Sequence, residues 1–317
     1  MPDQRSSRKA PATTERSSEP ALSGLPGAEE PSGPRVSAVL VAFNQAPALR
    51  RAIEALERSQ DRERLEILVV DCGSRDESPR LDADYPAVQI LRLPQHFGAT
   101  RAMNIAMRTA KAELVLLLSP DVEVAPDTVT RLAAYLTEGS GAEDASAAAV
   151  CPLLCDPSGQ PVSRAYRIPS SAALAAGALE PMNIDLAQES IAVEYAGRDA
   201  LLVRKQFIRG MNYFDERFGE YWADLDLAMQ IRRVGKKIRL YPSIRVTLHP
   251  GQDPLQGDAV ADTDRILGAA AFLGKYEGFF AGLRFRLAAI LKALGRFDLR
   301  GLGLLISGEK IGSQAGR

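Results

Sequence analysis

Two periods of apolar residues alternate along the first half of the chain. Nearly continuous apolar runs predict strands at 36–43, 65–70, 88–93 and 114–118. Apolar residues spaced three or four positions apart predict helices between these runs, at 47–58, 98–110 and 126–136. Strands that are apolar on both faces and alternate with helices are typical of a mainly parallel sheet covered by helices. The pattern therefore predicts an α/β, Rossmann-like fold.

The second half of the chain has a less regular pattern. Further strands are predicted at 146–155, 200–203, 238–240 and 244–248. A short helix is predicted over 225–234, where Gly235 ends it. Residues 160–185 contain three prolines and follow neither period, so we expect an irregular region there.

The two ends of the chain differ from the part between them. Residues 1–34 hold six prolines, six serines and no aromatic residue, which predicts a disordered tail. Residues 280–317 carry a net charge of +5, and their apolar residues recur at helical spacing. A basic amphipathic helix suits either the surface of an anionic membrane or the surface of the α/β domain, and both alternatives stay open. These features predict a tail (1–34), an α/β domain (35–252) and a helical extension (253–317).

The bulk composition excludes several classes of protein. The formal net charge is −1 and aromatic residues make up 6%, so we expect no nucleic-acid partner. Three cysteines and two histidines are too few for a disulfide framework or a structural zinc site, so buried thiols in a reducing compartment, the cytoplasm, are expected. We find no run of about 18 apolar residues, so no membrane span is predicted. The N-terminus also lacks the apolar segment of a secretory signal.

Polar residues follow the predicted parallel strands, at the edge where such sheets bind ligands. Phe43 and Asn44 end the first strand, and Asp71 ends the second, shortly before Ser74. The Asp71 carboxylate could accept a hydrogen bond from a nucleotide base or a ribose hydroxyl. Asp121 follows the fourth strand, where it could hold a divalent cation on a diphosphate or cap a turn.

Further candidates lie on or near predicted helices. Asp224 and Asp226 begin the helix of the second half, beside the single tryptophan, and both cannot cap it. The other carboxylate could act as a general base. Arg101 lies in the first turn of the helix after Gly98, where it could reach a phosphate. His249 ends the last strand, a position that suits a ligand or a structural role.

Six segments resemble, in order, the family 2 glycosyltransferases, which have the GT-A fold, and in particular their rhamnosyltransferase-like branch. The resemblance covers about residues 36–252. The segments are VSAVLVAFN (36–44), VVDCGSRDES (69–78), FGATRAMNIAMRTAKAELVLLLSPDVEV (97–124), VCPLLCDPSGQPVSRAYRIPS (150–170), ALLVRKQFIRGMNYFDERFGEYWADLDLAMQIRRVGKKIRLYP (200–242) and VTLHPGQ (246–252).

The resemblance implies a metal-dependent, inverting transfer of a sugar from a nucleoside diphosphate sugar to a glycan or lipid-linked acceptor, in cell-surface polysaccharide synthesis. Asp71 matches the family's nucleotide-contacting aspartate, and Asp121 matches the last carboxylate of its metal-binding motif. Asp224 matches the catalytic aspartate. His249 matches a late histidine that can join the metal, Mn²⁺ or Mg²⁺, and the diphosphate. The residues expected to bind the nucleotide sugar are Phe43, Asn44, Asp71, Ser74, Arg101 and Asp121.

Two residues depart from the family pattern. Ser119 replaces the first acidic residue of the metal-binding motif, which predicts weak metal binding without the diphosphate. Ala223 replaces the glutamate that usually precedes the catalytic aspartate, so Asp226 could share or take over the role of base. A non-catalytic module that binds a nucleotide sugar therefore stays an alternative. A nucleotidyltransferase is disfavoured, because residues 42–47 are neither glycine-rich nor basic.

The expected location follows from these features. The cysteines and the absence of a predicted span point to the cytoplasm, and the basic extension allows peripheral contact with the inner face of the cell membrane.

Overall fold

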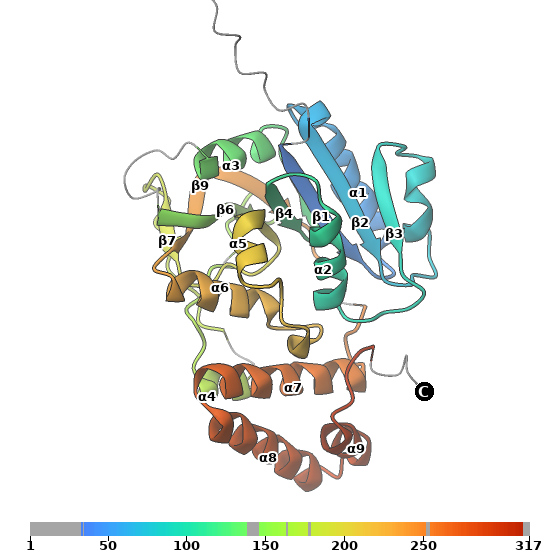
Figure 1. Ribbon diagram of the computed structural model, residues 1–317, viewed down its shortest axis with the longest axis vertical. Coiled ribbons are helices and arrows are strands. Elements are labelled where there is room, and N and C mark those ends of the chain that lie inside the picture. The colour runs from blue at the N-terminus through green and yellow to red at the C-terminus, as the bar shows by residue number, and fades with distance from the viewer. Residues whose placement is uncertain are drawn as a thin grey trace, which may run out of the picture. The chain divides into compact units, whose positions relative to one another are not determined.

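The computed structural model describes residue 33 and residues 35–137, 146–162, 164–176, 179–251 and 254–312. The disordered tail predicted for 1–34 therefore lies outside the described residues, apart from Gly33. Within them, nine strands form one sheet in the order β3-β2-β1-β4-β8-β6-β9-β5, and β7 pairs with β9 (Figure 1). The strands are β1 (Val36–Ala42), β2 (Leu65–Asp71), β3 (Val88–Arg92), β4 (Leu114–Leu118), β5 (Val122–Glu123), β6 (Ala147–Cys155), β7 (Ile191–Val193), β8 (Ala200–Arg204) and β9 (Lys237–Leu248).

The prediction of a mainly parallel sheet holds for the first half of the chain. There, β3, β2, β1 and β4 pair in parallel. In the second half β8 runs antiparallel to both β4 and β6, and β9 is parallel to β6 but antiparallel to β5 and β7. The sheet as a whole is mixed, which changes the set of loops that reach its ligand-binding edge.

Helices cover both faces of the sheet because the strands are apolar on both faces. In β1, Ala38 and Leu40 pack in the cluster under α1 and α3, whereas Val39 packs on the other face with α2, α6 and α7. This alternation is the period of two expected of a strand. The helices are α1 (Ala46–Glu57), α2 (Ala99–Thr109), α3 (Thr128–Thr137), α4 (Ser171–Ala176), α5 (Lys205–Gly210), α6 (Ala223–Arg233), α7 (Ala259–Tyr276), α8 (Phe279–Gly295) and α9 (Leu299–Ser307).

The strand pieces predicted on either side of Pro242 form one strand, β9. Its register against β6 shifts between two neighbouring pairs, from Pro152↔Tyr241 to Leu153↔Arg245. Proline has no backbone N–H to donate to the ladder, and a bulge allows it within a sheet. The bulge therefore lets the strand continue through a residue that the sequence pattern predicts as a break.

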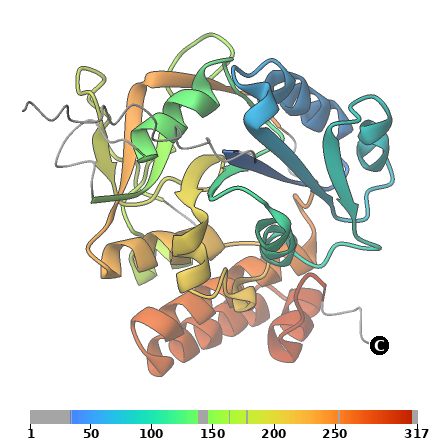
Figure 2. The ribbon, with the colours of Figure 1, turned by 45° about the horizontal axis from the view of Figure 1, so that its top comes forward.

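Helices α7, α8 and α9 form a C-terminal layer, in which each contacts the other two (Figure 2). Phe272 and Leu273 of α7 pack into the cluster that also contains α2 and α6. In α8, by contrast, Gly282 and Ala293 are the buried residues. Among the described residues, no helix is long and apolar enough to cross a bilayer.

Candidate active site

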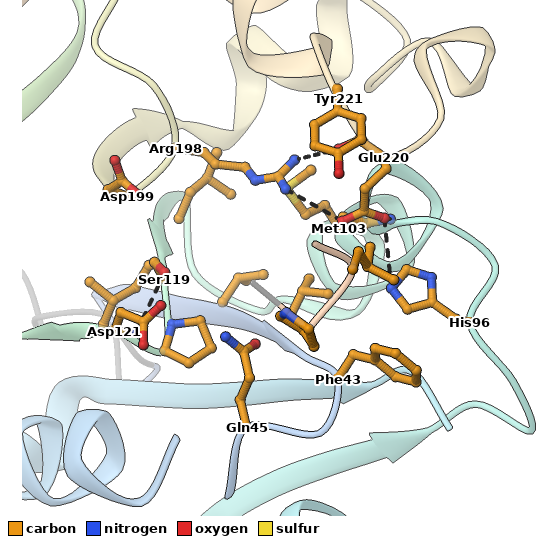
Figure 3. Close-up of a pocket in the computed structure, with 18 residues that line it drawn as sticks. Phe43, Gln45, His96, Met103, Ser119, Asp121, Arg198, Asp199, Glu220 and Tyr221 are labelled. Atoms are coloured by element: carbon orange, nitrogen blue, oxygen red, sulfur yellow. Dashed lines mark hydrogen bonds and ion pairs between the residues drawn. The ribbon is translucent and has the colours of Figure 1, made fainter. Parts of the chain in front are cut away.

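The ends of β1 and β4 open onto a cavity of about 250 Å³ (Figure 3). Phe43 and His96 lie on one side of it, and Asp121 lies on the other. Arg198 and Glu220 form the wall opposite Phe43. The cavity therefore lies at the carboxyl ends of parallel strands, where the sequence predicts a ligand site.

The antiparallel strand β8 brings two charged residues to this edge that the sequence reasoning missed. Leu118, the last residue of β4, pairs with Ala200, the first residue of β8. The backbone N–H of Ser119 donates to the carbonyl of Asp199 at 2.8 Å. Arg198 and Asp199, which precede β8, consequently line the same cavity as Asp121. The signal available in the sequence was a pair of charged residues directly before an apolar run.

Glu220 anchors a charged cluster on the wall of the cavity. Its Oε2 accepts a hydrogen bond from the backbone N–H of Ala99 at 2.6 Å, at the start of α2. Arg198 Nη1 donates to the Glu220 carbonyl at 3.1 Å, and its Nη2 lies 3.7 Å from Oε1. His96 Nε2 lies 3.7 Å from Oε2, and burial lowers the pKa of His96, so the imidazole is neutral at pH 7. The positive end of α2 is thus occupied by a carboxylate of the protein itself.

Arg101, expected to reach a phosphate, lies elsewhere. Its side chain is exposed and stacks on the Phe97 ring, with the guanidinium carbon 4.9 Å from the ring centroid. It does not line the cavity. Among the described residues, Arg198 is the arginine that lines the cavity.

Asp121 is the carboxylate of the predicted metal site that faces the cavity. Burial raises its pKa, and the nearby Asp199 carboxylate adds to this effect. The ring of His249 does not join it, because its Nε2 lies 2.8 Å from Glu123 Oε2 on β5. Its backbone N–H donates to the Asp121 carbonyl at 2.9 Å.

The side chains around Asp121 offer few ligands for a divalent cation. Within the described residues, no three histidine, cysteine or acidic side chains converge as a metal site. Asp121 and Asp199 both line the cavity and fit a cation that arrives with a diphosphate, because Mg²⁺ uses one or two carboxylates plus phosphate oxygens.

Asp71 ends β2, beside the strand that borders the cavity. Its Oδ2 accepts hydrogen bonds from the backbone N–H groups of Gly73 and Ser74, at 3.2 and 3.1 Å. Its Oδ1 is buried and has no hydrogen-bond partner in the described part of the chain. A buried oxygen without a partner is costly in a folded protein, and it suits a ligand that donates an N–H.

The loops after β1 and β2 are held together by hydrogen bonds. Asn44 donates from its backbone to Ser74 Oγ at 2.8 Å, and its Oδ1 accepts from the Arg75 N–H at 2.9 Å. Asn44 and Ser74 therefore contact each other, although the sequence predicts that both bind the nucleotide sugar. Gly73 has φ +74°, and a Cβ there would lie 2.7 Å from the Gln95 Cα, so this turn requires glycine.

A second cavity, of about 380 Å³, adjoins the first and contains Asp224. The two cavities share Arg198, Asp199, Glu220 and Tyr221. Tyr195 donates to Asp224 Oδ2 at 2.8 Å. Burial and the Asp224 charge hold the pKa of Tyr195 well above its usual range, so its hydroxyl stays protonated.

The two aspartates of α6 have different surroundings. Asp226 is 1% exposed, and its Oδ1 accepts from Lys275 Nζ at 2.7 Å and Tyr276 Oη at 2.5 Å, both on α7. Asp226 lines neither cavity. Trp222, directly before α6, has φ +73°, a left-handed conformation that is rare for a bulky residue. Residues two positions apart on a helix do not face the same side, so Asp224 and Asp226 meet different partners.

Known proteins are similar to this chain in sequence and in fold. Residues 37–150 match the family model described as glycosyl transferase family 2. An N-acetylglucosaminyl-diphospho-decaprenol L-rhamnosyltransferase of Mycobacterium tuberculosis is 26% identical over 68% of this chain and 78% of its own length. An N-acetylglucosaminyltransferase of Mesorhizobium japonicum is 35% identical, but the match covers 36% of this chain and 28% of that relative.

Solved structures give the same fold. GalNAc-T7 crystallised with UDP, GalNAc and Mn²⁺ has a TM-score of 0.58 and 17% identity, over 75% of this chain and 48% of its own. S. aureus TarS 1–349 in complex with UDP-GlcNAc has a TM-score of 0.54 and 15% identity, over 76% and 66%. The fold is thus that of the GT-A glycosyltransferases. Residues 37–150 thus match a family 2 glycosyltransferase domain, and the chain is similar to glycosyltransferases over a longer stretch.

Proposed function

We propose that this protein is an inverting glycosyltransferase that moves a sugar from a nucleoside diphosphate sugar to a hydroxyl of a glycan or lipid-linked acceptor. One observation carries the proposal: two adjoining cavities share one charged wall, with Asp121 in the first and Asp224 in the second. A displacement that inverts the anomeric carbon needs the leaving group and the base on opposite sides of the sugar. The two cavities offer a compartment for each.

In this proposal the nucleoside diphosphate occupies the cavity of Asp121. The unpartnered Oδ1 of Asp71 accepts a hydrogen bond from the base, and Phe43 borders the bound nucleoside. Arg198 binds the diphosphate, for which a guanidinium offers paired donors. Both related structures named above contain UDP or a UDP-sugar, which supports a nucleoside diphosphate as the ligand.

The proposed cofactor is a divalent cation, Mn²⁺ or Mg²⁺. Asp121 would hold it together with oxygens of the donor's diphosphate, and His249 would orient the Asp121 backbone. When bound, the cation neutralises charge on the leaving diphosphate. Arg198 adds positive charge to the same cavity from the protein itself.

Asp224 is the proposed general base. It takes the proton of the acceptor hydroxyl as that oxygen bonds to the anomeric carbon, and the bond from this carbon to the diphosphate oxygen breaks with its electron pair. Tyr195 holds one carboxylate oxygen by donating to it, which leaves lone pairs for the acceptor. Asp226 does not compete for this role, because Lys275 and Tyr276 hold its buried carboxylate.

We further propose that the enzyme builds a cell-surface polysaccharide in the cytoplasm, at the inner face of the membrane. The name of the mycobacterial relative specifies an acceptor linked to decaprenol, and another relative, from Rhizobium meliloti, is named for succinoglycan biosynthesis. Nine of the eleven large apolar side chains exposed in the described residues lie between Phe279 and Ile306. Basic residues interleave with them, as in helices that bind membrane surfaces.

The test incubates the enzyme with Mn²⁺, an extract that contains acceptors, and each of a panel of nucleoside diphosphate sugars. We expect at least one of these sugars to act as a donor, and the release of its nucleoside diphosphate measures the rate. Asp224→Asn should lower this rate by about 10²–10⁴-fold, the usual loss on removing a general base, without changing thermal stability. Asp226→Asn should mainly lower stability, because it weakens the contacts with Lys275 and Tyr276.

Full activity of Asp224→Asn would contradict the assignment of the base. Calorimetric binding of a nucleotide sugar with no release at any concentration of Mn²⁺ would instead support the alternative of a non-catalytic binding module.

A further inference from the structure

The C-terminal layer contains a groove of about 550 Å³ between α7, α8 and α9. Its volume lies within the range of pockets that bind small organic ligands. Ala288 and Ala289 of α8, Ile266 of α7 and Leu305 of α9 contribute apolar wall. Neither the donor nor the general base requires this groove, so its role is unassigned.

The groove adjoins the cavity of Asp224. Trp222 and Arg265 line both spaces. The indole Nε1 of Trp222 donates to the Arg265 carbonyl at 2.9 Å, which fixes the ring between them. The Arg265 guanidinium carbon lies 4.5 Å from the centroid of the Tyr221 ring, which lines both cavities of the active site. A ligand in the groove could therefore extend towards the proposed base.

Charge is distributed unevenly along the groove. Lys292 and Arg296 line it one turn apart on α8, near the alanines of the apolar wall. Arg265 adds a third basic group at the end that adjoins the cavity of Asp224. Of the two carboxylates present, Asp262 lies 3.8 Å from Arg265, and Asp298 accepts from the Gly301 N–H at the start of α9. An apolar wall beside basic groups is complementary to a molecule with a hydrocarbon chain and an anionic head.

The outer side of α8 gives such a molecule a route from a bilayer. Leu287 and Leu291, which are 49% and 67% exposed, lie on the same helix as the groove residues Ala288 and Lys292. A lipid surface that covers these leucines would therefore lie next to the groove.

We infer that the groove between α7, α8 and α9 binds the lipid end of the acceptor, with the hydrocarbon chain against α8 and its phosphate or diphosphate at Lys292, Arg296 or Arg265. The inference rests on the proposed function, because it assigns the acceptor of that reaction to lipid-linked sugars. In this inference the groove binds an amphiphilic molecule, and the nucleotide binds in the cavity of Asp121.

The test uses farnesyl diphosphate as the probe, below its micelle concentration and without any sugar donor. Trp222 is the only tryptophan of the chain and lines both the groove and the cavity of Asp224, so its fluorescence responds to a ligand where the two meet. We expect a saturable change in emission. Ala288→Phe adds bulk at an exposed groove position and should raise the half-saturating concentration at least tenfold. Leu291→Phe, a matched change on the same helix outside the groove lining, should leave it within twofold.

Two further probes separate the sources of the signal. Farnesol should bind more weakly than farnesyl diphosphate, because it lacks the anionic head. Inorganic diphosphate should not reproduce the change; if it does, the signal comes from the diphosphate subsite and the inference is wrong. An absence of saturable change, or equal effects of Ala288→Phe and Leu291→Phe, would also overturn it. Since no transfer is measured, failure of the proposed reaction would leave this result intact, and failure here would leave the reaction intact.

Discussion

At the residue scale, two of the carboxylates predicted for the site line a cavity, whereas the predicted arginine does not. Asp121 and Asp224 line the two cavities, and Asp71, at the end of the neighbouring strand β2, has a buried oxygen with no partner among the described residues. The position of Arg101 at a helix start predicts a phosphate contact, but Glu220 accepts a hydrogen bond from the Ala99 N–H there. Arg198 reaches the cavity through the pairing of β4 with β8, which no local pattern indicates.

This difference gives a prediction for the two arginines. Arg198→Ala should lower kcat/KM for the donor by about 10–100-fold, because it removes a charge-assisted contact with the diphosphate. Arg198→Lys should restore part of the loss, since it keeps the charge but not the paired donors. Arg101→Ala should stay within twofold of the wild type. Steady-state kinetics with varied donor measure all three, and a larger loss for Arg101→Ala would reverse the assignment.

At the element scale, α2 is tied to the segment that leads to Glu220. The Asn104 side chain donates to the Phe214 carbonyl at 2.9 Å and accepts from the Phe214 N–H at 3.0 Å. Asp264 of α7 accepts from the Glu220 N–H at 2.6 Å. The charged wall of the active site is thus positioned by side chains of two helices, one from each side.

Replacement of Asn104 by alanine should destabilise the fold. Two backbone groups of Phe214 would lose their partners in a buried place, which costs roughly 2–4 kcal/mol of unfolding free energy. Arg108→Ala, at an exposed position of the same helix, should cost at most about 1 kcal/mol, because it removes only a cation–π contact with the Tyr213 ring. Urea unfolding measures both, and equal effects would argue against the role of Asn104.

Asp264 should make stability depend on pH. Burial raises its pKa from 3.8 to about 6, and Glu220 adds to this while Lys310 and the Glu220 N–H oppose it. Since the folded pKa exceeds the unfolded one, this group's contribution to stability is full below about pH 4 and is lost as pH rises through about 6. In Asp264→Asn the side chain does not ionise. The unfolding free energy of this variant should therefore rise relative to that of the wild type as pH increases from 4 to 6.5. Parallel profiles for the two proteins would contradict this expectation.

At the scale of the whole molecule, the C-terminal layer combines two features. From the sequence, packing on the α/β domain and exposure to a membrane surface were alternatives for this region. Its helix α7 packs on the glycosyltransferase domain, through Phe272 and Leu273 among others. Its helices α8 and α9 expose large apolar residues to solvent. The layer can therefore be attached to the domain and still offer a surface to a membrane.

Vesicle binding tests that surface. Leu287→Glu combined with Leu291→Glu should reduce co-sedimentation with vesicles that contain an anionic phospholipid by at least threefold, because it removes apolar contact and adds repulsion. Leu186→Glu, a change at a leucine that is 46% exposed outside this layer, serves as the matched control and should have no effect. Equal, weak binding by all three proteins would remove the support for a location at the membrane.

The sequence by itself determined most strands, most helices and which carboxylates follow strands, because the burial of a strand or of a helix face produces a local period of apolar residues. It also predicted the apolar and basic C-terminal helix now seen as α8. It did not predict the short strands β5 and β7. Only the tertiary structure decided that Arg198 and Asp199 line the same cavity as Asp121, that Asp226 is held by α7, and that a groove adjoins the cavity of Asp224. The reason is physical: these contacts join residues far apart in the chain, and strand direction and helix packing, not local pattern, bring them together.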